Sequence, residues 1–237
     1  MSETRDGNIA IILAGGVGHR MHNAQPKQYI EVEGRPIISY TLSPVFASEL
    51  FEKVVICADP VWHDYILENL PENVNADQII FSMPGETRQF TIFNALKLIG
   101  EKFPACHSVL IHDAARPLVT KHLLKGCLEA LKKAEGVLPA LKVKDTIYQS
   151  LDGKRVSSML DRSTLYAGQS PEAFLFKPYL KAHQDSSKDE LLKINGSSEI
   201  ALAKGLTVDI IEGEENNFKI TTPEDLARFT HIIKSTK

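Results

Sequence analysis

A glycine-rich run with two basic residues beside it is the part of this sequence that most directly suggests chemistry. The run begins at Leu13 and ends at Gly18, and the basic residues Arg20 and Lys27 follow it. It comes directly after an apolar stretch, residues 9–13, that predicts a buried strand. Glycine lets backbone N–H groups approach phosphate oxygens closely, and the two cations add fixed positive charge. The pattern predicts a nucleotidyl-transfer site, where such groups stabilise developing charge.

The run differs from two well-known phosphate-binding motifs. A P-loop would end in Gly-Lys-Ser/Thr, which this sequence lacks here. A dinucleotide-binding fingerprint would need a third glycine where Met21 stands, and an acidic residue near the end of the next strand. We therefore expect a nucleotide whose phosphates lie across the loop and contact Arg20 and Lys27. The alternative is that both cations are solvated surface residues.

A second candidate site follows the apolar run 108–112. Asp113 comes at the end of this predicted strand, and Ala114 and Arg116 follow within three positions. A carboxylate at the carboxyl end of a parallel strand is well placed to bind Mg²⁺, which commonly takes one or two carboxylates together with substrate phosphates. Alternatively, Asp113 pairs locally with Arg116. His112 has no second metal ligand at suitable spacing, so we expect it to be a packed or hydrogen-bonding residue.

A third candidate is the segment 84–88 with Thr91 just beyond it. Gly85 would permit close approach of the backbone, and Thr87 would cap a following helix whose N-terminus favours anions. Taken alone, the segment predicts no more than the start of a helix.

Strand-like and helix-like stretches alternate along most of the chain. The predicted strands are 53–58, 78–81 and 108–112, and the predicted helices are 36–47, 60–69, 88–99 and 121–134. This alternation predicts an α/β fold with a mostly parallel sheet and helices on both faces. Ligands of such sheets bind at the carboxyl ends of the strands, so we expect the loops after Leu13, Phe81 and His112 to converge on one crevice.

The alternation breaks at about Lys142. Residues 142–149 and 155–160 predict a β-hairpin around a turn at 150–154. Its exposed edges would need a partner, so the segment 142–162 is interpreted as a dimerisation arm. Further on, 207–212 and 217–220 predict strands. Thr222 is a helix N-cap followed by Pro223, and this last helix is expected to end at about residue 234.

Composition narrows the class of protein. The chain has 237 residues, 43% of them hydrophobic and 24% charged, and a net charge of −3. These values are typical of a globular protein and argue against general binding of nucleic acid. The polar N-terminus and the lack of a long apolar stretch predict a cytoplasmic protein that does not bind membranes. We expect three free buried thiols (Cys57, Cys106, Cys127) and a single domain over 1–237.

Several of these motifs, taken in order, resemble the IspD/TarI cytidylyltransferases. The shared segments are Leu-Ala-Gly-Gly-x-Gly-x-Arg-Met, Pro-Lys-Gln, Gly-Glu-x-Arg, His-Asp-Ala-Ala-Arg-Pro, Val-Lys-Asp-Thr, Asp-Arg and Phe-Lys-Ile-Thr-Thr-Pro-Glu-Asp-Leu. The resemblance extends from about residue 8 to residue 233. Enzymes of this family have a Rossmann-like nucleotidyltransferase fold, similar to GT-A, with a protruding β-hairpin arm. They attach CMP to a small polyol phosphate and release pyrophosphate.

The resemblance implies roles for individual residues on the nucleotide side. Arg20 and Lys27 would stabilise charge on the reacting α-phosphate. Mg²⁺ would be the cofactor, and Asp113 its protein ligand. The residues implied to bind CTP are Leu13, Ala14, Gly15, Gly16, Gly18, Gly85, Glu86, Arg88, Thr91, Asp113 and Ala114.

It also implies roles on the acceptor side. Arg162 and Lys219 would act in catalysis by positioning the incoming phosphate. In the family the arm crosses to the second subunit of a homodimer, so Thr146 and Arg162 would serve the neighbouring site. The residues implied to bind the acceptor are Asp113, Arg116, Thr146, Arg162, Ser170 and Lys219.

One departure bears on the choice of acceptor. The family carries a Thr-Asp pair where this chain has the segment 194–199, Ile-Asn-Gly-Ser-Ser-Glu. The first loop, at Ala14–Gly16, and the segment Tyr166–Pro171 look closer to the branch that uses D-ribitol 5-phosphate, which we expect to be the acceptor. Alternatives are 2-C-methyl-D-erythritol 4-phosphate, a further polyol phosphate, a different nucleotide with a sugar phosphate, and an inactive nucleotide-binding relative.

Overall fold

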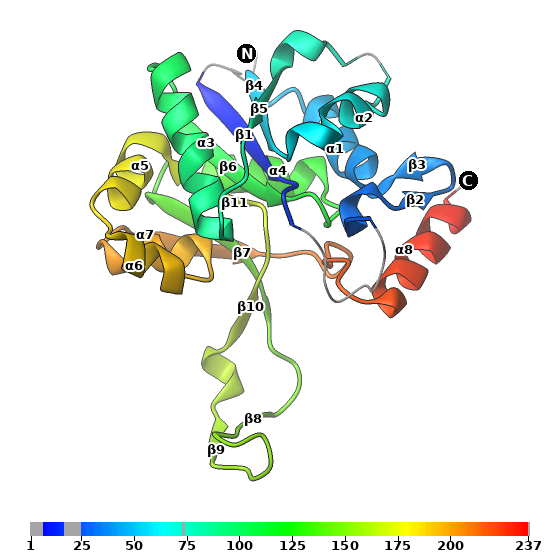
Figure 1. The fold of residues 1–237 in the computed structure, drawn as a ribbon. Helices are drawn as coiled ribbons and strands as arrows, with labels where there is room; N and C mark the ends of the chain where they lie inside the picture. Colours follow the sequence, from blue (N-terminus) through cyan, green and yellow to red (C-terminus); the bar gives the residue numbers. More distant parts are fainter. Residues whose placement is uncertain (1–6, 17–24, 73, 237) are drawn as a thin grey trace.

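The computed structural model describes residues 7–16, 25–72 and 74–236, and it shows an α/β fold (Figure 1). Four strands form the parallel part of the central sheet, in the spatial order β6-β1-β4-β5. Their bounds are β1 Asn8–Leu13, β4 Lys53–Cys57, β5 Ile79–Ser82 and β6 Ser108–Asp113. All four were predicted from their apolar runs, and the mostly parallel sheet flanked by helices is confirmed.

The rest of the sheet contains strands of both directions. β11 (Glu172–Leu175) lies between β6 and β7 (Gly136–Lys142) and is antiparallel to both, and β12 (Val208–Glu212) pairs in parallel with the other edge of β7. β10 (Tyr166–Gly168) pairs with the end of β7. Because β11 is reversed, its first residue lies opposite Ile111, next to the carboxyl end of β6. A segment that the sequence did not predict as a strand thus enters the candidate site.

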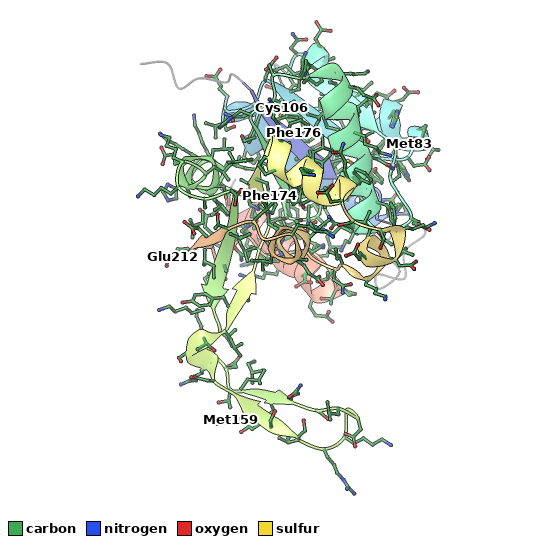
Figure 2. All side chains as sticks on the ribbon, turned by 90° about the vertical axis from the view of Figure 1, so that its left-hand side faces the viewer. Met83, Cys106, Met159, Phe174, Phe176 and Glu212 are labelled. Atoms are coloured by element: carbon green, nitrogen blue, oxygen red, sulfur yellow. The ribbon has the colours of Figure 1, made fainter. Side chains whose placement is uncertain are left out.

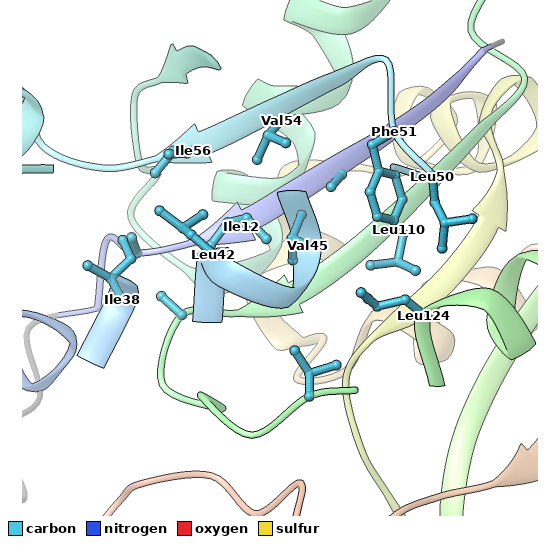
Figure 3. Close-up of a cluster of buried hydrophobic side chains, with 14 of the residues drawn as sticks. Ile12, Ile38, Leu42, Val45, Leu50, Phe51, Val54, Ile56, Leu110 and Leu124 are labelled. Carbon is cyan, nitrogen blue, oxygen red and sulfur yellow. The ribbon is translucent and has the colours of Figure 1, made fainter. Parts of the chain in front are cut away.

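Side chains alternate between the two faces of the sheet, and each face is covered by helices. The face that contains Ile12 and Leu110 packs against α1 (Ile37–Ala47), α2 (His63–Glu68) and α4 (Lys121–Ala130) (Figure 3). The opposite face packs against α3 (Arg88–Lys102), α5 (Phe176–Gln184), α6 (Lys188–Lys193) and α7 (Ser197–Ala203). The two helix layers approach the site from opposite sides of the sheet.

A smaller cluster lies beside this sandwich. Phe229 of α8 (Pro223–Ser235) packs on Ile30, Val32, Ile37 and Ile220. The same region contains a 3₁₀ turn, η2 (Lys27–Tyr29), and a short ladder of β2 (Glu31–Val32) with β3 (Arg35–Pro36). The C-terminal helix therefore supports the segment that carries Lys27.

Threonine caps start three of the helices. Thr87, Thr120 and Thr222 accept backbone N–H bonds at the N-termini of α3, α4 and α8. For α8 the cap, Pro223 and the early acidic residues confirm the sequence signal. The three cysteines are buried free thiols, also as expected. None of the described helices is long and apolar enough to cross a membrane.

Two of the predicted helices are shorter than expected. Residues 60–69 form a 3₁₀ turn, η3 (Pro60–Trp62), before α2, because the Asp59 carboxylate accepts the Val61 N–H and tightens this first turn. The predicted helix 121–134 ends at Ala130, where the chain turns toward β7. A further 3₁₀ turn, η4 (Ala76–Gln78), precedes β5.

Residues 217–220 were predicted to form a strand, but they form a loop. The Ile220 N–H donates to the carbonyl of Ala115 at 2.9 Å, and the Asn217 side chain donates to the carbonyl of Ser170 at 2.7 Å. These contacts fasten the segment against the loop after β6, so that it does not form a ladder with a neighbouring strand. Lys219 is thereby brought toward Asp113.

The predicted hairpin is present and protrudes from the body of the molecule (Figures 1 and 2). Its ladder is shorter than predicted: β8 (Ile147–Gln149) pairs with β9 (Ser158–Leu160), while Lys142 belongs to β7. The 3₁₀ turn η5 (Arg162–Thr164) follows β9. Five large apolar side chains of this arm are exposed: Tyr148, Leu151, Val156, Met159 and Leu160.

Candidate active site

The loops at the carboxyl ends of the parallel strands are joined to one another, as predicted. The Ala14 N–H after β1 donates to the carbonyl of Cys57 on β4 at 3.0 Å, and the Ala114 N–H after β6 donates to the carbonyl of Leu13 at 3.1 Å. The two segments with the strongest sequence signals are therefore adjacent. The sheet forms the rigid base from which both extend.

The described part of the glycine-rich loop is fixed by two residues of η2. The side-chain amide of Gln28 donates to the carbonyls of Ala14 and Gly16, the latter at 2.9 Å, and the Tyr29 hydroxyl donates to Ala14 at 3.2 Å. Both side chains are buried. The sequence analysis gave Gln28 and Tyr29 no role, although Gln28 lies in the Pro-Lys-Gln motif. Because Lys27 precedes them in the same turn, its backbone is fixed beside the loop. The predicted residues Gly18 and Arg20 lie outside the described part of the chain.

Aromatic side chains pack around Tyr29 and support the turn η2. The Tyr29 ring stacks on Trp62 with centroids 4.1 Å apart, and Tyr65 meets both rings edge-on. Burial raises the pKa of Tyr29 above its ordinary value, so the hydroxyl remains a hydrogen-bond donor at neutral pH. The loop thus rests on a fixed aromatic stack.

Close packing also explains two of the predicted glycines. A Cβ on Gly15 would lie 2.5 Å from Pro84 Cβ, and one on Gly85 would lie 2.5 Å from Phe90 Cβ. The Thr91 hydroxyl accepts the Gly85 N–H at 2.9 Å and so fixes this turn. The loops after β1 and β5 can therefore meet because Gly15 lacks a side chain, and the β5 loop can turn tightly into α3 because Gly85 lacks one.

Glu86 in the same turn has a different environment. It is exposed, and its carboxylate lies 3.1 Å from the Lys188 ammonium at the start of α6. The structure therefore brings Gly85 and Thr91 together beside the glycine-rich loop, while Glu86 points to the surface near α6. Their roles in binding a nucleotide remain predictions.

Three cations surround the carboxylate of Asp113. Oδ2 lies 2.9 Å from the Lys219 ammonium and 3.6 Å from Arg116 Nε, and Oδ1 lies 3.7 Å from Arg88 Nε. Asp113 itself is buried, at 8% exposure, whereas the Lys219 side chain is 36% exposed. Three positive charges around one carboxylate leave an excess that favours an anionic ligand.

The charge state of Asp113 follows from these neighbours. Burial alone would raise its pKa, but the charges of Lys219 and then Arg88 oppose that effect and bring the pKa well below its ordinary value. The carboxylate is therefore ionised across the neutral pH range. The sequence-based alternative, a local pair with Arg116, describes only one of its three partners.

His112, on the preceding position, is fixed in one tautomer. Its Nε2 lies 3.1 Å from the carbonyl of Arg116 and must donate to it, so Nδ1 accepts the Ser170 hydroxyl at 3.1 Å. Ser170 in turn accepts the Asp113 N–H at 3.1 Å. Burial lowers the pKa of His112 to about 4, which keeps the ring neutral. The expected hydrogen-bonding role of His112 is confirmed.

Arg116 is fixed from the other side of the cluster. Its Nη1 donates to the carbonyl of Asn217 at 2.6 Å. The predicted residues Asp113, Arg116, Ser170 and Lys219 thus come together, although they are far apart in the sequence. The Ser170 hydroxyl accepts the Asp113 N–H and also contacts His112, and the Ser170 carbonyl accepts the Asn217 side chain.

A second carboxylate, which the sequence patterns do not reveal, lies next to this cluster. Glu172 is buried, and its Oε1 lies 3.5 Å from Nη2 of Arg88. The guanidinium of Arg88 therefore lies between Asp113 and Glu172, within the cationic cluster, and its role in binding CTP stays a prediction. The only available signal was an acidic residue directly after Ser-Pro, which does not indicate burial.

Two predicted residues lie on the arm. Thr146 is exposed in the segment before β8, and the Arg162 guanidinium donates to the carbonyl of Lys144 at 2.8 Å. Lys144 also pairs with Glu215, which ties the base of the arm to the segment that leads to Lys219. Within one chain, Thr146 and Arg162 are thus placed on the protruding arm (Figure 1).

The residues of the site fit Mg²⁺ only in part. Among the described residues there is no group of three or more His, Cys, Asp or Glu side chains that could bind a metal ion. Asp113 Oδ1 is 3.7 Å from its cationic neighbour, longer than a hydrogen bond, so this oxygen could serve as one ligand. Phosphate oxygens would have to supply most of the others, as is common for Mg²⁺.

Comparison with known proteins agrees with this architecture. The family described as IspD, 2-C-methyl-D-erythritol 4-phosphate cytidylyltransferase, matches residues 8–235. A ribitol-5-phosphate cytidylyltransferase of Streptococcus agalactiae serotype V is 31% identical over 94% of this chain and 93% of its own length. A 2-C-methyl-D-erythritol 4-phosphate cytidylyltransferase of Geobacillus thermodenitrificans is 36% identical over 95% and 96%, respectively.

A solved structure shows the same fold. The 4-diphosphocytidyl-2C-methyl-D-erythritol synthase of Anaerococcus prevotii superposes with a TM-score of 0.81 and 28% identity, covering 97% of both chains. These matches define the protein as an enzyme of the nucleotidyltransferase class. The chain belongs to the IspD family of cytidylyltransferases.

Proposed function

We propose that this cytidylyltransferase transfers CMP from CTP to D-ribitol 5-phosphate and forms CDP-ribitol and pyrophosphate. One observation carries the proposal: the cationic cluster around Asp113 adjoins the glycine-rich loop at a single edge of the sheet. A triphosphate on the loop and a phosphorylated acceptor at the cluster would bring two anions into reacting distance.

In the proposed reaction an oxygen of the acceptor phosphate attacks the α-phosphorus of CTP. A new P–O bond forms there, and the bond to the oxygen that bridges the α- and β-phosphorus breaks, so that pyrophosphate leaves with that oxygen. The phosphate is already a nucleophile, so no covalent enzyme intermediate is needed. Positioning and charge stabilisation supply the acceleration. Lys27 and Arg20 are assigned to the α-phosphate, in line with the family motif.

Lys219 is assigned to the acceptor phosphate. Its side chain is 36% exposed, and its ammonium contacts Asp113 at 2.9 Å. A phosphate dianion would compete for the same ammonium, and the carboxylate would then turn to a hydroxyl of the acceptor or to a cation. Arg116 is more buried and tied to Asn217, so we assign it to orienting Asp113.

Mg²⁺ is the proposed cofactor, with Asp113 as one protein ligand. When bound with CTP, it would supply positive charge that neutralises the triphosphate. Asp113, Lys219 and Lys27 would bind and orient the two substrates whether or not the ion contacts the protein directly.

The acceptor is the finer part of the proposal. Segment 168–171, Gly-Gln-Ser-Pro, resembles the ribitol branch, and it lies at the site because Ser170 contacts His112 and Asp113. The alternative acceptor, 2-C-methyl-D-erythritol 4-phosphate, is supported by the family description and by relatives of similar identity. Segment 194–199 departs from the Thr-Asp pattern and suits neither branch fully.

We also propose that the enzyme is a homodimer that joins through the arm. The exposed apolar side chains of the arm favour burial against a second copy. Such a dimer would bring Thr146 and Arg162 to the site of the neighbouring chain. The proposed reaction takes place in the cytoplasm, where its nucleotide substrate is available.

The test is pyrophosphate release measured with CTP, Mg²⁺ and each polyol phosphate side by side. We expect turnover with D-ribitol 5-phosphate to exceed that with 2-C-methyl-D-erythritol 4-phosphate. The opposite preference would identify 2-C-methyl-D-erythritol 4-phosphate as the acceptor and refute the assignment of D-ribitol 5-phosphate. Turnover with UTP or GTP in place of CTP would contradict the nucleotide assignment.

A further inference from the structure

A buried carboxylate that none of the assigned roles uses lies one side chain away from Asp113. Glu172 is the first residue of β11, and its side chain is 9% exposed. Its Oε2 accepts both the backbone N–H of Ser198 at 3.0 Å and the Ser198 hydroxyl at 2.7 Å. A buried carboxylate is costly unless it is paired, and these contacts with Arg88 and Ser198 provide that pairing.

Arg88 connects this carboxylate to the site. Its Nη2 lies 3.5 Å from Glu172 Oε1, its Nη1 donates to the Ser197 hydroxyl at 2.6 Å, and its Nε lies 3.7 Å from Asp113 Oδ1. One guanidinium thus bridges Asp113 and the start of α7. Its planar fork has few other orientations that keep all three contacts.

The bridge ends at the segment where the sequence departs from its family. Ser197 and Ser198 directly follow Ile194–Gly196, and Glu199 accepts the backbone N–H groups of Asn195 and Gly196. The conformation of this segment is therefore fixed at both ends, by Glu199 within α7 and by Glu172 from the sheet.

We propose that Glu172 is a positioning residue that fixes segment 194–198 against Arg88 and thereby determines which acceptor the site takes. The inference rests on the proposed function, since it assumes that the cluster at Asp113 receives the acceptor phosphate. Glu172 does not contact the acceptor in this account. It acts through Arg88 and through the hydrogen bonds of Ser198.

The glycine-rich loop, to which the triphosphate is assigned, is supported separately from Glu172, which makes the inference testable. The glycine-rich loop is fixed by Gln28 and Tyr29, on the helix layer of α1 and α2. Segment 194–198 belongs to the opposite layer, with α3 and α7. Loss of the Glu172 contacts should therefore change acceptor use and leave CTP binding nearly unchanged.

The experiment uses the full chain with Glu172→Gln and Ser198→Ala, and Glu190→Gln as a matched control. Glu190 caps α6 on the surface and does not contact Arg88. For each variant, kcat and KM are measured for CTP, D-ribitol 5-phosphate and 2-C-methyl-D-erythritol 4-phosphate. Hydrogen–deuterium exchange is followed in peptides that cover 191–200 and 7–16.

For Glu172→Gln we expect the ratio of kcat/KM for the two acceptors to change about tenfold, since hydrogen bonds to a charged group are lost, while the KM for CTP stays within about twofold. Ser198→Ala should shift the ratio in the same direction by about threefold, because it removes one such bond and keeps the charge. Exchange should rise over 191–200 and not over 7–16.

Three results would overturn the inference. Equal losses with both acceptors, together with a raised KM for CTP, would indicate a general structural role. A lower KM for both acceptors would indicate that Glu172 merely dilutes the positive charge. Unchanged exchange over 191–200 would show that the segment is not anchored by Glu172. A wild-type enzyme inactive with both acceptors would instead refute the proposed function, and the exchange measurement would still decide the anchoring.

Discussion

The Lys219 ammonium lies 2.9 Å from Oδ2 of Asp113 and joins the segment before α8 to the carboxyl end of β6. The lysine charge keeps the carboxylate ionised, and the carboxylate pairs with the most exposed of the three cations around it. In the proposed reaction an acceptor phosphate replaces Asp113 as the partner of this ammonium.

Removal of the carboxylate should therefore damage acceptor use. In Asp113→Asn the three cations lose the carboxylate that they share and keep only Glu172, which pairs with Arg88. We expect kcat/KM for the acceptor to fall about 10²-fold or more, the scale seen when one preorganised electrostatic group is lost. Steady-state kinetics measure the change, with Asp209→Asn, an exposed residue of β12, as the matched control. An Asp113→Asn enzyme with near-normal acceptor kinetics would show that the cluster is structural.

Stability should fall on mild acidification because two histidines are buried in neutral form. Burial lowers the pKa of His112 and of His183 to about 4, below the unfolded value of 6.5. The unfolded chain binds these protons first, so stability is present above pH 6.5 and declines toward pH 4, by up to about 1.4 kcal/mol per pH unit for each ring. Urea unfolding at several pH values measures the slope. A flat profile between pH 6.5 and 4 would contradict the neutral state of both rings.

Gln28 should matter for the nucleotide and not for the acceptor. Its amide fixes the carbonyls of Ala14 and Gly16, so Gln28→Ala should raise the KM for CTP about tenfold through loss of two buried hydrogen bonds. Isothermal titration of CTP provides a second measurement. Gln184→Ala, at the exposed end of α5, is the control. Unchanged CTP affinity in Gln28→Ala would show that the described part of the loop does not contribute to nucleotide binding.

Lys27 is predicted to act on the rate more than on affinity. If its charge stabilises the reacting α-phosphate, Lys27→Ala should lower kcat by about 10²-fold or more. Single-turnover measurements at saturating substrates isolate this step. Normal turnover in the variant would refute the assignment.

The arm provides a test of assembly. If Arg162 of one chain serves the site of the other, Arg162→Ala should mainly raise the KM for the acceptor. When Arg162→Ala chains are mixed with Lys27→Ala chains, part of the activity should return, because each mixed dimer has one site in which both residues are intact. Sedimentation of each variant checks that dimers persist. If mixed dimers regain no activity, Lys27 and Arg162 act in the site of the same chain.

Much of the fold follows from local sequence patterns. The strands β1, β4 and β6 have continuous apolar runs because they are buried on both faces, and the caps at Thr87 and Thr222 mark the helices that follow. The convergence of their loops follows from the rule for parallel sheets. For these elements local residue types and the final structure agree.

The rest depends on contacts between distant segments. β11 is short and starts with a charged residue, and its reversed direction is visible only from its pairing with β6 and β7. The burial of Glu172 follows from that pairing. Segment 217–220 has the apolar pattern of a strand, yet Ile220 bonds to Ala115 in a loop. Neither outcome is encoded in local periodicity.

The arrangement of the two substrates is tested most directly by a crystal structure of Lys27→Ala with CTP, Mg²⁺ and D-ribitol 5-phosphate bound. We expect the triphosphate along the backbone of residues 14–16 and the acceptor phosphate on Lys219, which has then left Asp113. A triphosphate bound elsewhere, with Lys219 still paired to Asp113 and the acceptor phosphate far from both, would contradict it.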